Sequence, residues 1–421
     1  MTTSPCRPFA VNRLCLAIAF LWLSGPAHAQ VVSQRGFVEG RALAFPQEAP
    51  NDATRVIGDV LVREEAFFKP APWLQLSGGL DLRANSHDQV DDEWRIDVAD
   101  RGVRRSRLSV RRATATFSSG RLTLDAGKQF IRWGKADIVN PTDRFAPRDF
   151  LNVVDSEFLA VTGVRGVARL GEHDSIEAVW LPRFTPSRIP LLGQRWTAVP
   201  ADAAPFPIVD ADSDLPTGAQ TGVRWTRVGD RLEYSASFFD GFNHLPNIEA
   251  VVRQPFAPEI AIRRVYPSIR SYGADAAVPT RWFTLKAEAA YVTSSSPSTD
   301  EYVLYVIQVE RQTGEWVFVG GYAGEVVSDH RAPLVFAPDR GMTRSLVGRA
   351  SYTIDTNRSF ELETAVRQDA GGMYAKAEYS QAQGQHWRTT LAGALIRGEP
   401  DDFLGQYRRN SHVSLTLRYS F

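Results

Sequence analysis

The clearest strand pattern in the sequence is His412-Val-Ser-Leu-Thr-Leu-Arg-Tyr-Ser-Phe421. Its apolar and polar residues alternate, so one face of a strand carries Val413, Leu415, Leu417, Tyr419 and Phe421. A strand of this kind that closes on an aromatic residue is typical of outer-membrane β-barrels. The pattern predicts an all-β fold, a transmembrane antiparallel β-barrel. It also predicts Tyr419 and Phe421 as the signal that the barrel-assembly machinery reads.

The opposite end of the chain has the features of a secretory signal peptide over residues 1–29. Arg7 and Arg13 are basic, residues 14–23 are apolar, and Ala27-His28-Ala29 is an A-x-A cleavage site. The apolar stretch is too short to cross a bilayer as a helix. We therefore expect export to the periplasm and a barrel over residues 30–421 in the cell outer membrane of a Gram-negative bacterium.

Composition excludes several functions for the expected mature chain. The two cysteines are Cys6 and Cys15, so residues 30–421 contain no disulfide, thiolate metal site or cysteine nucleophile. The whole chain has 48 basic and 48 acidic residues, and removing Arg7 and Arg13 leaves 46 against 48. This slight acidity argues against a nucleic-acid partner.

Alternating strands continue through the rest of the sequence. A clear example is 282–293, where Phe283, Leu285 and Ala287 alternate with polar residues. Short turns and long connections also alternate, which is typical of short periplasmic turns and long extracellular loops. The ladder predicts about 16–18 strands, which enclose a lumen wide enough for water unless a plug fills it. The expected strands include 104–117, 121–132 and 262–278, and Lys286–Glu288 and Lys376–Glu378 are expected to pair within the wall.

The most distinctive segment is Arg132-Trp-Gly-Lys-Ala-Asp-Ile-Val-Asn-Pro-Thr-Asp-Arg-Phe-Ala-Pro-Arg-Asp-Phe150. It opens the long connection 133–160, and its turn formers and mixed charges favour a loop that folds inward and narrows the pore. The alternative is an external loop held by its own salt bridges. The constriction candidates within this segment are Arg132, Lys135, Asp137, Asp143, Arg144, Arg148 and Asp149.

An arginine row supplies the remaining pore-lining candidates. Arg105, Arg107 and Arg111 share one face of the expected strand 104–117. Arginine on the lipid face near the midplane costs about 2–4 kcal/mol, so the row should face the lumen. It either opposes acids of the 133–160 loop across the pore or pairs with acids on adjacent strands. The sequence leaves both interpretations open.

The run Arg132-Trp133-Gly134, with Asp137, Asn140-Pro141 and Asp143, resembles the signature of a largely uncharacterised, porin-like group of Gram-negative outer-membrane β-barrels. The segments 179–188 and 403–421 resemble the same group. The resemblance implies the barrel and the membrane, and it implies no cargo. Its signature residues here are Trp133, Gly134, Asn140 and Pro141.

Two further loops have distinctive compositions. The connection 183–218 is rich in proline and in apolar residues, so it caps the mouth, gathers an apolar solute or packs on its own barrel. Asp88, Asp91, Asp92 and Glu93 form an acidic cluster in the connection 85–103. That cluster is either a solvated loop or a site for calcium or for cations that bridge lipopolysaccharide.

These features predict a porin-like channel that passes small solutes down a gradient, with outer-membrane lipid and lipopolysaccharide as partners and with no cofactor or metal. No G-x-S-x-G or H-E-x-x-H motif occurs, and we expect no enzyme. Two alternatives remain. One is a carrier of apolar cargo, lipid or hydrocarbon, that works with a periplasmic partner. The other is a structural or assembly barrel. A homo-oligomer is possible in principle, but no interface signature identifies it.

Overall fold

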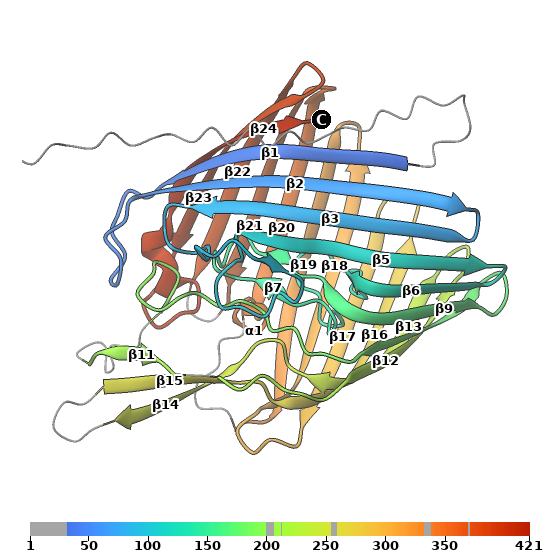
Figure 1. Cartoon of the computed structure of the whole chain (residues 1–421), viewed down its shortest axis with the longest axis horizontal. Helices are drawn as coiled ribbons and strands as arrows, with labels where there is room; N and C mark the ends of the chain where they lie inside the picture. Colours follow the sequence, from blue (N-terminus) through green and yellow to red (C-terminus); the bar gives the residue numbers. More distant parts are fainter. Residues whose placement is uncertain (1–31, 199–205, 212, 254–258, 332–337, 369–370) are drawn as a thin grey trace, which may run out of the picture. The chain divides into compact units, whose positions relative to one another are not determined.

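A computed structural model describes residues 32–198, 206–211, 213–253, 259–331, 338–368 and 371–421. The expected signal peptide, 1–29, lies outside the described residues. Within those residues, eighteen long antiparallel strands form one closed barrel, as the sequence predicted (Figure 1). No helix of the described chain has the length and apolar character needed to cross a membrane.

The barrel wall is built from neighbours in sequence, each hydrogen-bonded to the next. The wall strands are β1 (Val32–Ala44), β2 (Val56–Ala71), β3 (Leu74–Asn85), β5 (Leu108–Ser119), β6 (Leu122–Gln129), β9 (Val161–Arg169), β10 (Asp174–Leu181), β12 (Gln220–Val228), β13 (Glu233–Phe242), β16 (Ser268–Pro279), β17 (Thr284–Ser294), β18 (Glu301–Thr313), β19 (Trp316–Asp329), β20 (Ser345–Asp355), β21 (Arg358–Arg367), β22 (Met373–Gln383), β23 (Trp387–Arg397) and β24 (His412–Ser420).

The first and last strands close the wall. β1 pairs with β24 from Phe37 opposite Ser420 to Ala44 opposite Val413. The amide of Phe421 donates to the carbonyl of Gly36 at 3.0 Å, and Tyr419 packs on Trp387 with ring centroids 5.0 Å apart. A closed sheet leaves no edge strand unpaired, which a β-structure in hydrocarbon requires.

The two faces of the wall differ as the alternation predicted. Val413, Leu415 and Leu417 on β24 are exposed on the outer face, whereas Ser414 between them is buried inside. Connections at one end of the barrel have two to four residues, and the longer loops lie at the other end. Gly120 and Gly314 occupy short turns at φ of 55° and 56°, a conformation that favours glycine.

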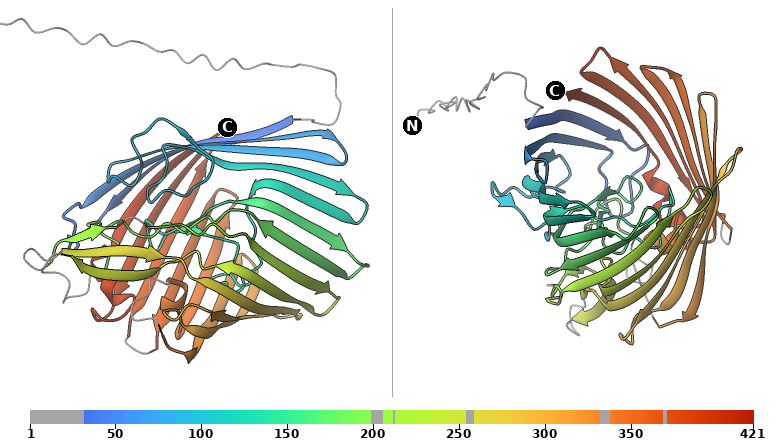
Figure 2. Two further views of the ribbon diagram at one scale, coloured as in Figure 1. Left: turned by 60° about the horizontal axis from the view of Figure 1, so that its bottom comes forward. Right: turned by 90° about the vertical axis from the view of Figure 1, so that its right-hand side faces the viewer.

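Short elements lie within the long connections between the wall strands. They are β4 (Ile96–Asp97), β7 (Arg148–Asp149), β8 (Glu157–Phe158), β11 (Ile208–Asp210), β14 (Asn247–Arg253), β15 (Glu259–Val265), the helix α1 (Pro338–Gly341) and the 3₁₀ helix η1 (Gly405–Asn410). β11, β15 and β14 form a separate three-stranded sheet. Figure 2 shows this sheet extending from the long-loop end of the barrel.

Three expected strand boundaries were wrong. The strand expected over 262–278 is divided into β15 and β16 at Tyr266-Pro267, because proline lacks the amide that the ladder needs. The strand expected over 104–117 begins only at Leu108, and the strand expected over 121–132 ends at Gln129. The strand 121–132 ends early because the chain leaves the wall at Gln129 to build the loop described next, and residues 104–107 belong to the connection between β3 and β5.

Candidate functional site

The site is built by residues 130–160, which connect β6 to β9 and are called the inward loop below. The carboxylate of Asp143 accepts hydrogen bonds from the amides of Trp133 at 2.6 Å and Gly134 at 2.7 Å, and this closes its first turn. A Cβ at Gly134 would lie 2.6 Å from Cβ of Asn140, so only glycine fits there. Pro141 is buried beside them. The signature residues thus form one compact turn.

Aromatic side chains hold this turn against the wall. Trp133 is 3% exposed and meets Phe145 edge-on, with ring centroids 4.9 Å apart. Phe145 in turn meets Phe239 of β13 at 4.9 Å. The indole nitrogen of Trp133 donates to Glu177 of β10 at 2.7 Å, which satisfies its polar atom. The inward loop therefore carries its own apolar anchor.

Glu288 of β17 fastens the backbone of the inward loop. One carboxylate oxygen accepts from the amides of Lys135 at 2.8 Å and Ala136 at 3.0 Å, and the other accepts from the amide and hydroxyl of Thr142, both at 2.8 Å. Glu288 is 2% exposed. A buried carboxylate with four donors is a strong and specific tether.

Two charged side chains of the inward loop reach neighbouring strands. Lys135 lies 2.7 Å from Glu233 and 3.1 Å from Asp275. Asp137 lies 3.1 Å from Lys286 of β17 and 3.5 Å from Arg349 of β20, and it also accepts from Gln308 of β18. The expected Lys286–Glu288 pair was wrong, because both side chains bind the inward loop. Lys376–Glu378 does pair, at 3.6 Å.

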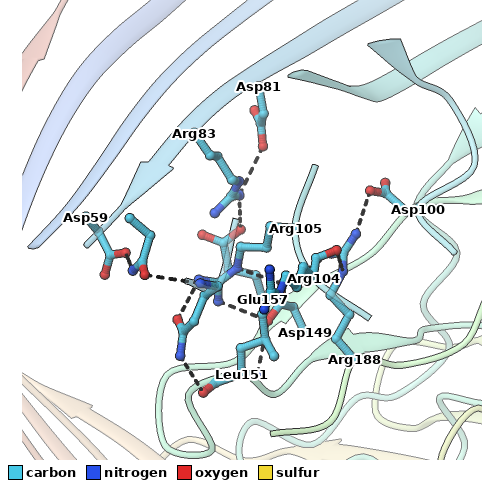
Figure 3. Close-up of polar contacts among 12 residues, drawn as sticks. Asp59, Asp81, Arg83, Asp100, Arg104, Arg105, Asp149, Leu151, Glu157 and Arg188 are labelled. Atoms are coloured by element: carbon cyan, nitrogen blue, oxygen red, sulfur yellow. Dashed lines mark hydrogen bonds and ion pairs between the residues drawn. The ribbon is translucent and has the colours of Figure 1, made fainter. Parts of the chain in front are cut away.

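Next to β5, the guanidinium of Arg105 donates two hydrogen bonds of 2.8 and 2.9 Å to the carboxylate of Asp149 in the inward loop (Figure 3). Arg188 lies 3.2 Å from the same carboxylate and 3.0 Å from Asp100. Burial by itself would raise the pKa of Asp149, but Arg105 and Arg188 outweigh burial and lower it below its usual range. Asp149 therefore stays ionised near neutral pH.

Asp155 attaches the far end of the inward loop to β1 and β22. Its carboxylate pairs with Arg41 of β1 and lies 2.9 Å from Lys376 of β22. Burial would raise the pKa of Asp155, and the two cations lower it below its usual range instead. With Glu288 and Asp149, Asp155 makes the third tether, so the inward loop crosses the interior of the barrel (Figure 2).

The sequence left two interpretations open for the arginine row, and each of them applies to one of its members: Arg105 opposes an acid of the inward loop, and Arg111 lies near acids of the wall. Arg105 precedes β5 and binds the inward loop through Asp149. Arg111, displaced by a bulge in β5, lies 3.8 Å from Glu65 of β2 and 4.0 Å from Asp81 of β3. Arg107 also precedes β5 and pairs with Asp92 of its own loop at 2.5 Å, so the expectation of one continuous row on a strand was wrong.

The other candidates close the inward loop on itself. Arg132 lies 3.4 Å from Asp143, and its guanidinium stacks over Phe158 at 4.1 Å. Arg148 covers the same ring, also at 4.1 Å, and donates to Asn140 at 3.1 Å. One phenyl ring therefore joins the two arms of the loop through cation–π contacts.

A cavity of about 420 Å³ lies between the inward loop and the strands β20 to β23. Arg144, which is buried, and Arg148 line it beside Asp137 and Asp155. Much of the remaining lining is apolar and includes Phe150, Val153, Val154, Ile396, Leu404 and Tyr407. This space is both charged and apolar, which suits a small amphipathic solute.

The part of the connection 182–219 around Trp196 packs on its own barrel, one of the three outcomes considered for the connection, whereas β11 joins the separate sheet with β15 and β14. Trp196 packs on Tyr407, with ring centroids 5.7 Å apart. Arg195 donates to the carbonyls of Gln47 at 2.6 Å and Arg409 at 3.0 Å. His244, from the next loop, lies between the carbonyls of Thr185 and Arg144, and burial lowers its pKa to about 4. The described part of this connection thus supports the inward loop from outside.

The lowered pKa values predict an acid-sensitive anchor. Because Asp149 and Asp155 ionise below their unfolded value of about 3.9, their stabilisation is complete above about pH 4 and is lost as the pH falls further. We expect the temperature at which the barrel loses its compact gel mobility to drop between about pH 4 and pH 2. Asp149→Asn should show a smaller drop, and an unchanged temperature in the wild type would contradict the prediction.

Sequence reasoning missed the residues that receive the inward loop, chiefly Glu288, Gln308 and Arg41 of the wall and Arg188 of the connection 182–219. Glu288 and Gln308 occupy inward positions of alternating strands, so their polarity was a detectable signal. Their partner was not detectable, because it lies about 150 to 170 residues away in sequence. Among the described residues, which include the acidic cluster 88–93, no group of three or more His, Cys, Asp or Glu side chains is placed to hold a metal ion.

No protein-family model matches the sequence, and no curated protein matches it. Solved structures do match. OccK3 (OpdO) of Pseudomonas aeruginosa has a TM-score of 0.52 at 12% identity, over 92% of this chain and 96% of that chain. OccAB4 of Acinetobacter baumannii has a TM-score of 0.54 at 10% identity, over 92% and 97%.

A structure of P. aeruginosa OpdK with vanillate is similar too, with a TM-score of 0.52 at 11% identity over 92% of this chain and 98% of that chain. A BenF-like porin from Pseudomonas fluorescens has a TM-score of 0.54 at 9% identity, over 93% and 98%. These identities establish a shared fold. The chain is therefore an eighteen-stranded antiparallel barrel with the fold of Gram-negative outer-membrane porins.

Proposed function

We propose that this protein is an outer-membrane channel through which small solutes diffuse into the periplasm. The observation that carries the proposal is the inward loop, which is tethered on several sides and leaves a cavity of about 420 Å³ beside β20 to β23. The apolar outer face and the polar inner face support a membrane location. The porin fold of its structural neighbours supports passive transport rather than an enzymatic role.

Under this proposal the inward loop sets the size limit of the pore. Asp137, Arg144 and Arg148 line the cavity and are proposed to contact solutes. Lys135, Asp143 and Asp149 are proposed to hold the loop, since their partners are nearby side chains or amides. Charges of both signs at the cavity predict weak selectivity between small ions.

A single-cysteine experiment tests the path. Residues 30–421 contain no cysteine, so Val153→Cys places one thiol in the cavity and Leu415→Cys places one on the outer face. In a planar bilayer we expect both variants to conduct. A bulky thiol reagent should reduce the current through Val153→Cys and leave Leu415→Cys unchanged. If the current through Val153→Cys stays the same after the thiol reagent is added, the solute path does not run through this cavity.

A second candidate function, transport of an apolar cargo, is favoured by the apolar part of the cavity lining, including Phe150, Val154 and Leu404. A silent bilayer from protein with folded gel mobility, together with a lipid or hydrocarbon that co-purifies, would support it over the channel. A silent bilayer without cargo would favour the structural or assembly role.

We also propose that the assembly machinery reads the last strand through Tyr419 and Phe421. Both aromatic residues lie at the short-turn end of the wall, and Phe421 is half exposed. Lipid and lipopolysaccharide remain the proposed surroundings of the barrel.

A further inference from the structure

The connection between β3 and β5 exposes apolar side chains that a solvated acidic loop would not need. Trp94 is 73% exposed, Ile96 62% and Val98 60%. They follow directly on Asp91, Asp92 and Glu93 in the sequence. Large exposed apolar side chains gathered in one short segment indicate an interaction surface.

Residues 94–98 lie beside the part of β5 that β6 does not reach, because β6 ends where the inward loop begins. β6 pairs with β5 only from Ser119 opposite Leu122 to Ala113 opposite Lys128, and then the chain turns into the lumen. β5 itself continues to Leu108, so part of its edge would be left without a partner. β4 covers that edge, with Ile96 opposite Leu108 and Asp97 opposite Ser109 in parallel pairing. The segment thus replaces β6 in the wall.

The two faces of the segment differ in the same way as those of a wall strand. On the inner side, Asp97 accepts from the hydroxyl of Ser106 at 2.7 Å. Asp100 lies 2.6 Å from Lys128 and 3.0 Å from Arg188, and all three are buried. On the outer side, the side chains of Trp94, Ile96 and Val98 make no hydrogen bond or ion pair with the residues that the structure describes.

The outer side continues the apolar face of the barrel. Leu82 of β3 lies opposite Leu108 of β5, and Leu108 lies opposite Ile96, so the three residues form one row across neighbouring strands. Directly paired residues share one face of a sheet. Ile96 therefore faces the same medium as the outer face of β3 and β5.

From this row we propose that the side chains of Trp94, Ile96 and Val98 contact the acyl chains of the outer leaflet, as a patch that completes the wall where β6 leaves it. The proposal rests on the membrane location proposed above. Backbone groups on a β-edge in hydrocarbon need partners, and β4 supplies them to β5. Trp94, with the Arg107 guanidinium 5.1 Å from its ring, suits the boundary between acyl chains and headgroups.

Buried ion pairs behind the patch argue against a lateral exit for apolar cargo between β4 and β6. Lys128, Asp100, Arg188 and Asp149 are all buried directly inside it. An apolar molecule crossing here would have to separate these ion pairs, and breaking a buried pair is strongly unfavourable. The patch is thus a seal and not an opening.

Fluorescence quenching tests the proposal in the cysteine-free mature chain. Ile96→Cys and Val98→Cys are labelled with an environment-sensitive fluorophore in phosphatidylcholine vesicles, with Leu415→Cys as the lipid-facing control and Asp92→Cys as the aqueous control. The side chain of Asp92 is 99% exposed. We expect brominated acyl chains to quench positions 96 and 98 as they quench position 415, and iodide to quench only position 92.

Two results would overturn the proposal while leaving the barrel in the membrane. Iodide quenching at positions 96 and 98, with position 415 still quenched by lipid, would make the segment a solvated loop. Protection from both quenchers would indicate a contact with a second copy of the chain. Failure of position 415 to respond to brominated lipid would instead refute the proposed membrane location itself.

Discussion

In the Glu288→Ala variant we expect the inward loop to detach and the channel current to become larger and unsteady. The substitution leaves the amides of Lys135, Ala136 and Thr142 without their acceptor, and the last two of these bonds are buried. Each buried donor left unpaired costs about 1–3 kcal/mol. The wall should survive, because β17 keeps its backbone pairing with β16 and β18. Single-channel recording and limited proteolysis of the loop measure the two consequences.

The matched control is Glu310→Ala on β18. Glu310 also faces inward and lies 2.8 Å from Lys286, but it contacts no backbone of the inward loop among the described residues. It should leave the current close to that of the wild type, since a partly exposed ion pair contributes little. Equal currents from Glu288→Ala and the wild type would show that the loop does not depend on this carboxylate.

In the Gly222→Ala variant we expect a large loss of stability, although the substitution adds only one methyl group. A Cβ on this β12 residue would lie 2.7 Å from the ring of Phe145 and 2.8 Å from the carbonyl oxygen of Phe238. Overpacking of this kind costs about 1–3 kcal/mol. The phenyl ring must move, and Trp133 packs on it. The urea midpoint of unfolding should fall accordingly.

Gly393→Ala is the matched control, because a Cβ at that strand glycine meets no atom within 4 Å. It should be neutral or slightly stabilising, since alanine loses less backbone entropy than glycine. A double variant separates the two contacts at position 222. If the ring of Phe145 is the main obstacle, Gly222→Ala should cost less in a Phe145→Ala background. Equal costs in both backgrounds would assign the clash to the backbone of Phe238.

The fold was predictable from sequence because a barrel wall follows a local rule. Alternation with a period of two places Leu415 outside and Ser414 inside, whatever the neighbouring strand is. The position of the long connections was equally local, since turn formers mark where each strand ends. Even the inward direction of 133–160 was favoured, because its length and turn content are unusual for an external loop.

The partners in the site were not predictable, because they join distant parts of the chain. Glu288 and Lys286 alternate as a wall pair should, and only the structure shows that both reach the inward loop instead. Arg105 and Arg107 have the spacing of one strand face, but β5 begins only at Leu108, where β4 pairs with it, and both arginines lie in the preceding loop. Spacing reports the face of a residue only where the residue lies in a strand.

The tether at Asp155 has a consequence for the order in which the molecule is made. Its two cations come from β1 and β22, so they become neighbours only when the beginning and the end of the chain meet across the β1–β24 seam. The contacts at Glu288 and Asp149 do not involve this seam and can form in an unfinished sheet. The complete tether at Asp155 must therefore follow ring closure, so the loop is held at all three points only after the last strand has joined the first.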